Sequence, residues 1–114
     1  MIISDIVEIL KADVICGHEY LNREVKNVVA SDLMSDVLTI NSDQLLLLTG
    51  LSNIQTIRTA EMSDIQCVVL VRNKKASPEI IDLAEENGIV LIECEHSTYK
   101  SCGLLFQEGL KSIY

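Results

Sequence analysis

Short runs of aliphatic residues alternate along the chain with segments of helical periodicity. Uninterrupted apolar runs of this length are typical of strands that are covered by helices on both faces, because such strands have no solvent-facing positions. We predict three buried strands over residues 45–48, 67–71 and 89–92. Residues 13–16 are predicted to form a shorter strand that Gly17 ends, and residues 24–30 have strand propensity with imperfect alternation.

Polar capping residues mark where the helices are expected to begin. The clearest start is Ser77-Pro78-Glu79, which predicts a helix that runs to Asn87 and ends at Gly88. Capping-box spacing of Asp5 with Glu8 and of Ser52 with Gln55 favours two further starts. The remaining helices are predicted to begin at Ser31-Asp32 and at Ser97 or Thr98.

The last of these helices is predicted to carry an apolar face. Tyr99, Cys102, Phe106 and Leu110 recur at helical spacing. We therefore expect these four side chains to face the core.

Strand and helix alternate three times in the second half of the chain, which predicts parallel strands joined by right-handed crossovers. The expected fold is α/β, a single three-layer-type domain over residues 1–114 with a mostly parallel sheet and flanking helices. The sequence contains no linker rich in proline or glycine, so no internal domain boundary is expected.

Composition narrows the range of partners. The 114 residues include 9 Lys and Arg against 17 Asp and Glu, for a net charge of −8. An acidic balance argues against binding to nucleic acid or to an anionic membrane, since both need a basic face. No apolar run reaches the length of a membrane span, and the start of the chain lacks the basic region of a signal peptide. We expect a cytoplasmic protein.

Residues 21–37, LNREVKNVVASDLMSDV, resemble the signature region of the DRTGG domain family. In that family an Asp-Arg pair precedes a Thr-Gly-Gly turn and then an Ala-Ser-Asp-Leu-x-Ser segment. Arg23 matches the family arginine, and residues 30–33 and Ser35 match the later segment. Asn22 stands in place of the aspartate, and Lys26-Asn27-Val28 stand in place of Thr-Gly-Gly.

The resemblance implies a DRTGG-like α/β fold similar to the N-terminal domains of HPr kinase and of the Mur ligases. It also implies a regulatory or dimer-forming module without a catalytic role. Glycine pairs let backbone amides approach a ligand, and the β-branched Val28 is hostile to the positive φ that such a turn uses. The substituted pair therefore favours an alternative, a purely structural protein interaction domain with no small-molecule site.

Ligands of parallel α/β sheets collect at the carboxyl ends of the strands. We predict that a small anion or nucleotide binds there, without a cofactor or metal. No Walker-type or GxGxxG pattern is present, and a solvated polar loop is the competing interpretation. The candidate ligand-binding residues are Arg23, Ser31, Asp32, Thr49, Gly50, Ser52, Arg72 and Asn73.

Two Cys-x-His pairs, Cys16 with His18 and Cys94 with His96, raise a third alternative. If the pairs meet, they supply two sulfurs and two imidazoles, which is a zinc-type ligand set. Their spacing is not the Cys-x-x-Cys of structural zinc sites, so a metal protein or small enzyme ranks last. Cys67 and Cys102 are predicted to be core residues with free thiols.

The apolar content is high for a chain with so little volume in which to hide it. Hydrophobic residues make up 48% of the sequence, and the mean hydropathy is +0.29. A partly exposed sheet face of a small α/β domain is often covered in a symmetric dimer. We therefore predict a non-catalytic homodimer that senses a small anionic ligand on behalf of a protein partner.

Overall fold

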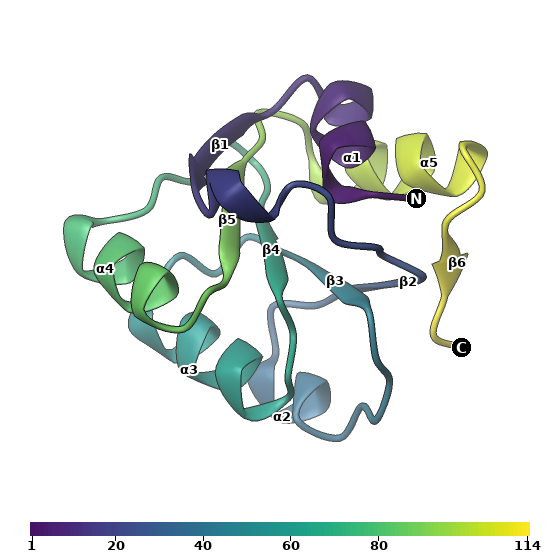
Figure 1. Cartoon of the computed structure of the whole chain (residues 1–114). Coiled ribbons are helices and arrows are strands. Elements are labelled where there is room, and N and C mark those ends of the chain that lie inside the picture. Colours follow the sequence, from purple (N-terminus) through teal and green to yellow (C-terminus); the bar gives the residue numbers. More distant parts are fainter.

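A computed structural model describes all 114 residues, which form one sheet with helices on both faces (Figure 1). Aliphatic side chains line both faces of this sheet. The strands are β1 (Asp13–Cys16), β2 (Asn27–Ala30), β3 (Leu45–Thr49), β4 (Cys67–Leu70), β5 (Val90–Glu93) and β6 (Lys111–Ser112). The helices are α1 (Ile3–Leu10), α2 (Met34–Val37), α3 (Ile54–Met62), α4 (Pro78–Glu86) and α5 (Thr98–Gln107). A single turn of 3₁₀ helix lies at His18–Tyr20.

The strand order is β1-β5-β4-β3-β2-β6. The strands β5, β4, β3, β2 and β6 are parallel to one another. Only the edge strand β1 runs antiparallel to its neighbour β5. The expectation of a mostly parallel sheet is confirmed. No strand was expected at β6, which pairs its two residues with the start of β2.

The helices form two layers, one on each face of the sheet (Figure 1). Helices α1 and α5 cover one face, where Ile6 and Leu105 pack with Leu46 and Val69. Helices α2, α3 and α4 cover the other face, and their buried side chains are Met34, Val37, Ile57, Ala60, Ile80 and Ala84. The buried strands expected at 45–48, 67–71 and 89–92 thus lie at the centre of a three-layer α/β domain.

Two helix starts agree with the capping signals in the sequence. The Ser77 hydroxyl oxygen accepts a hydrogen bond from the Ile80 N–H at 3.3 Å, and that of Ser97 accepts one from the Lys100 N–H at 3.1 Å. Gly88 follows α4 with φ +63°, the left-handed conformation expected of a helix terminator.

Three other helix starts were placed wrongly. Asn53, not Ser52, caps α3, and its side-chain oxygen accepts from the Thr56 N–H at 3.0 Å. Helix α2 begins at Met34 with Leu33 as its cap residue, so neither Ser31 nor Asp32 caps it. Helix α1 begins at Ile3 with Ile2 as its cap residue, ahead of the start expected at Asp5.

The expected core face of α5 is also wrong. Leu110 is buried as predicted, but Tyr99 is 90% exposed and Phe106 is 72% exposed, and Cys102 is only partly buried. Ser101 and Leu105 face the sheet instead. The apolar stripe of α5 therefore lies on the outside of the molecule.

None of the helices combines the length and apolar character needed to cross a bilayer.

Candidate functional site

Strands β2, β3, β4 and β5 run parallel, so the loops that follow them gather at one edge of the sheet. Seven of the predicted ligand-binding residues lie in these loops or at the strand ends, namely Ser31, Asp32, Thr49, Gly50, Ser52, Arg72 and Asn73. Ligands of parallel α/β sheets bind at this edge because the strand-to-helix loops converge there.

Asp32 is the centre of a hydrogen-bonded cluster at this edge. Its Oδ1 accepts from the Gly50 N–H at 2.7 Å and from the Thr49 hydroxyl at 3.0 Å. The Ser31 hydroxyl accepts from the Leu33 N–H at 3.0 Å, which turns the chain just after β2. Asp32 therefore links the end of β2 to the end of β3.

Arg72 completes the cluster from the loop after β4. Its Nη2 lies 3.6 Å from Asp32 Oδ2, and its guanidinium sits where a Cβ at Gly50 would have to lie. Roughly half of the Arg72 side chain is exposed, at 49%. The guanidinium is thus held in place on one side and open to solvent on the other.

The backbone around Arg72 adopts an uncommon conformation that fixes the loop. Arg72 and Asn73 both have positive φ, at 61° and 59°. Their N–H groups donate to His96 O at 2.8 Å and to Cys94 O at 3.0 Å. The loop after β4 is therefore tied to the loop after β5.

The cluster lowers the pKa of Asp32 below its usual value. The main cause is the hydrogen bond from the Gly50 N–H, and the Thr49 hydroxyl and the Arg72 charge act in the same direction, while partial burial opposes them. Asp32 is an internal anion that occupies donors a phosphate group would otherwise take. A ligand anion that uses the Gly50 N–H has to displace this carboxylate.

The sequence did not single out Glu93, which organises the neighbouring loop. The Glu93 side chain is 10% exposed; its Oε2 accepts from the Ala76 N–H at 2.8 Å and its Oε1 pairs with Lys75 Nζ at 3.5 Å. The Ser52 hydroxyl donates to Lys75 O at 2.7 Å. Its position at the carboxyl end of a buried apolar strand is the feature of the sequence that could have identified Glu93. Lys75 is thus partly neutralised, which leaves Arg72 as the cation nearest to the cluster.

Arg23 lies apart from these residues, at the opposite edge of the sheet. Its guanidinium stacks over the Tyr20 ring at 3.8 Å, and its Nη1 donates to Gly88 O at 2.5 Å. Gly88 precedes β5, so this contact is at the amino ends of the parallel strands. The structure gives Arg23 the role of joining the turn after β1 to the end of α4.

The residues that replace the Thr-Gly-Gly turn lie at the start of β2. Asn27 and Val28 pair with Leu45 and Leu46 of β3. None of the residues 26–28 has a positive φ. A β-branched residue suits this extended backbone, so the substitution is compatible with the local structure.

The model of the DRTGG domain family matches residues 5–107. The chain belongs to the DRTGG family. No curated protein matches it. A solved structure with a similar fold is described as the CBS and DRTGG domains of the regulatory region of a Clostridium perfringens pyrophosphatase in complex with the activator diadenosine tetraphosphate. The TM-score is 0.71 at 18% identity, over 90% of this chain and 45% of that chain. This DRTGG domain therefore spans less than half of that chain and shares the fold of the part that it matches.

The two Cys-x-His pairs of this DRTGG domain do not meet. Cys16 packs in the core between the sheet and the layer of α2, α3 and α4, whereas Cys94 packs on the opposite face with α1 and α5. Burial raises the pKa of the Cys16 thiol. No group of three or more His, Cys, Asp or Glu side chains gathers as a metal site would require. The zinc-type ligand set considered from the sequence is not assembled.

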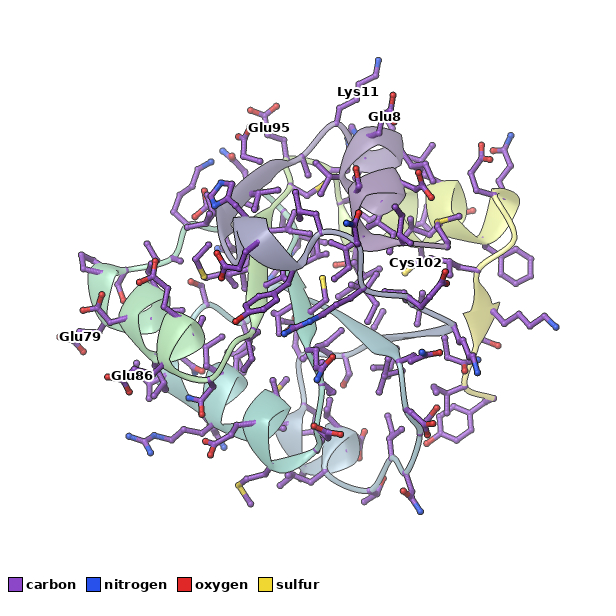
Figure 2. All side chains as sticks on the ribbon, in the orientation of Figure 1. Glu8, Lys11, Glu79, Glu86, Glu95 and Cys102 are labelled. Carbon is purple, nitrogen blue, oxygen red and sulfur yellow. The ribbon has the colours of Figure 1, made fainter.

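A second feature of the DRTGG domain is an apolar groove of about 390 Å³ between α5, β2 and the edge strand β6. Val28 and Ala30 of β2 form its floor, and Tyr99, Cys102 and Phe106 of α5 form one wall. Figure 2 labels Cys102 on this helix. No polar cluster lines the groove, so its chemistry differs from that of the Asp32 cluster.

Proposed function

We propose that this DRTGG domain is a non-catalytic regulatory domain that senses a small anion, such as a nucleotide, at the carboxyl edge of its sheet. The observation that carries the proposal is the half-exposed Arg72 side chain, whose guanidinium pairs with Asp32 and fills the space that a side chain at Gly50 would need. The similar regulatory region of the pyrophosphatase is complexed with a dinucleotide activator. Two observations therefore support the proposal. The similar protein region is regulatory, and Arg72 places a positive charge at the edge of the sheet where α/β proteins bind ligands.

Ligand binding at this cluster is an exchange of anions. A phosphate group that pairs with Arg72 in bidentate fashion replaces the longer contact between Arg72 and Asp32. Ser52 and Asn73 are the neighbouring polar side chains at the surface, whereas Thr49 is fully buried and reaches the site only through its hydrogen bond to Asp32. The exchange moves Asp32 away from Gly50, which gives the domain a bound and an unbound arrangement of the same loops.

A purely structural interaction domain is the second candidate. The observation that favours it is the occupation of the Gly50 N–H and the Thr49 hydroxyl by Asp32. In this alternative the cluster is a fixed junction between β2, β3 and β4. The two candidates differ in whether any anion changes the stability of the folded domain.

Thermal unfolding in the presence of ligand separates the two candidates. We expect AMP, ATP, diadenosine tetraphosphate or inorganic phosphate at millimolar concentration to raise the melting temperature, because a ligand that binds only the folded state stabilises it. The substitution Arg72→Gln should abolish the rise. Arg58→Gln is the matched control, since Arg58 is exposed on α3 and lies in no ion pair. If none of these compounds shifts the unmutated protein, the structural alternative holds.

We also place the domain in the cytoplasm and propose that it acts as a homodimer. Its four cysteines are free, which suits a reducing compartment. The groove beside α5 and the exposed Phe106 support a covered apolar surface. Light scattering at micromolar concentration tests the dimer, and a monomer mass contradicts it.

A further inference from the structure

Helix α5 presents an apolar stripe to solvent. Tyr99, Cys102, Gly103 and Phe106 follow one another at spacings of three, one and three residues, so they lie on one flank of the helix. Tyr99 is 90% exposed and Phe106 is 72% exposed. A Cβ at Gly103 would meet no atom within 4 Å, so the helix backbone is open at the middle of the stripe. An apolar helix flank of this kind lacks its packing partner.

The groove beside the stripe offers a complementary recess. Its floor is the face of β2 at Val28 and Ala30, which α5 leaves uncovered, and Leu110 and Ser112 bound its far side. Projecting rings and an apolar recess therefore occur on the same surface of one chain. A surface with both features fits a second copy of itself, because a two-fold axis brings each ring to the other copy's recess.

Charge favours the same occupant. Residues 97–114 contain Lys100, Lys111 and a single acid, Glu108, in a chain whose net charge is −8. The exposed acids of α4, such as Glu79 and Glu86, project on the far side of the molecule from Cys102 (Figure 2). Two acidic copies repel one another least when they meet at the surface with the fewest carboxylates.

We propose that the α5 stripe and the groove beside it form the interface of the proposed homodimer, with the α5 helices of two copies antiparallel across the two-fold axis. The inference rests on the proposed function and names its contact surface. The two rings together expose on the order of 300 Å² in each copy, against roughly 800 Å² that a standard interface buries on each side. The rings thus supply the centre of the interface, and the remaining area comes from the rim of β2 and β6.

Cys102 serves as a native reporter of this surface, because it is the only cysteine that is not fully buried. At micromolar and higher concentrations of the domain, we expect the rate of Cys102 labelling by a maleimide to fall as the dimer forms. Light scattering on the same samples should show the mass rise from one copy to two over the same concentration range. Loss of labelling in Cys102→Ser shows that Cys102 is the thiol that reacts with the maleimide.

The substitution Phe106→Glu tests the surface directly. It should weaken dimerisation by about 30-fold, as expected for loss of a central aromatic contact, and should restore fast labelling of Cys102. Met62→Glu is the matched control, because Met62 is also 72% exposed but lies on α3, on the opposite face of the sheet. The melting temperature of Phe106→Glu at low concentration should equal that of the unmutated monomer.

The outcomes separate the inference from the function on which it rests. A dimer mass with labelling of Cys102 that does not depend on concentration places the interface elsewhere and overturns the inference alone. A monomer mass at every concentration overturns both the interface and the proposed homodimer. Neither result decides whether the domain binds an anion, which the ligand-induced shift in the melting temperature of Phe106→Glu tests separately.

Discussion

The guanidinium of Arg72 occupies the space beside the Gly50 backbone that any side chain at position 50 would need. The lack of space explains why a glycine, which has no side chain, stands at position 50. Gly50 is not among the residues with positive φ, so backbone freedom is not what the position requires. The absence of a side chain allows Arg72 to lie close to Asp32.

Gly50→Ala should therefore displace Arg72 from the cluster without unfolding the domain. The end of the arginine side chain is flexible and half exposed, so we expect a loss in unfolding free energy of no more than about 1 kcal/mol. The anion-induced rise in melting temperature should disappear. The double variant with Arg72→Gln should lose no more unfolding free energy than Arg72→Gln alone. Additive losses of unfolding free energy would show that Gly50 acts through another contact.

Asp32→Asn should make the unfolding free energy of the domain depend less on pH. The folded pKa of Asp32 lies below its unfolded value. Its contribution to stability is therefore present above the unfolded pKa of about 3.9 and is lost as the pH falls through the folded pKa. Because the side chain is 55% exposed, we expect a loss of less than about 1 kcal/mol at pH 7 and a smaller loss at pH 2. Urea unfolding at both pH values, with the exposed Asp43→Asn as control, measures the difference. An equal loss at pH 2 would contradict an electrostatic cause.

Arg23→Gln should lower stability and leave anion sensing intact. The substitution removes the cation from the Tyr20 ring and the hydrogen bond to Gly88 O. We expect a loss of roughly 1–3 kcal/mol in unfolding free energy by chemical denaturation. The ligand-induced shift in melting temperature should equal that of the unmutated protein. A lost shift at retained stability would instead return Arg23 to the ligand-binding set.

Alanine at Gly17 and at Gly88 should differ in cost, although both glycines have positive φ. A Cβ at Gly17 would lie 2.8 Å from the α-carbon of Val90, whereas one at Gly88 would meet nothing nearer than 3.7 Å. Gly88→Ala should cost about 1 kcal/mol of unfolding free energy, the usual penalty of the left-handed conformation. Gly17→Ala adds a backbone clash and should cost more than about 2 kcal/mol. Equal losses in urea unfolding would argue that β1 moves away from β5 at little cost.

The sequence predicted the centre of the sheet well, because aliphatic runs buried on both faces leave a plain signal. It could not predict β6, since Lys111 and Ser112 pair through their backbones and both side chains are exposed. Spacing on α5 identified a real stripe but not which flank meets the sheet. Ser101, a small polar residue, faces the core, where its hydroxyl contacts the Cys94 thiol at 3.7 Å.

The candidate site was predictable where topology alone brings residues together. Thr49 ends β3 and Arg72 follows the neighbouring parallel strand β4, so both residues lie at the carboxyl ends of the strands and close in space. Arg23 entered through the family motif, which carries no information about which edge of the sheet it occupies. The role of Glu93 depends on the path of the loop from Lys75 to Ala76, which hydropathy does not encode.

Strand β2 ends with Ala30 on the floor of the apolar groove, and Asp32 stands two positions further along the chain in the polar cluster. If the proposed exchange of anions moves Asp32, the end of β2 that lines the proposed dimer surface is only two residues away along the chain. By reciprocal linkage, the factor by which occupancy of one location tightens the other must be the same in both directions. If docking and anion binding are coupled in this way, the affinity of the domain for the anion changes with the concentration of the protein.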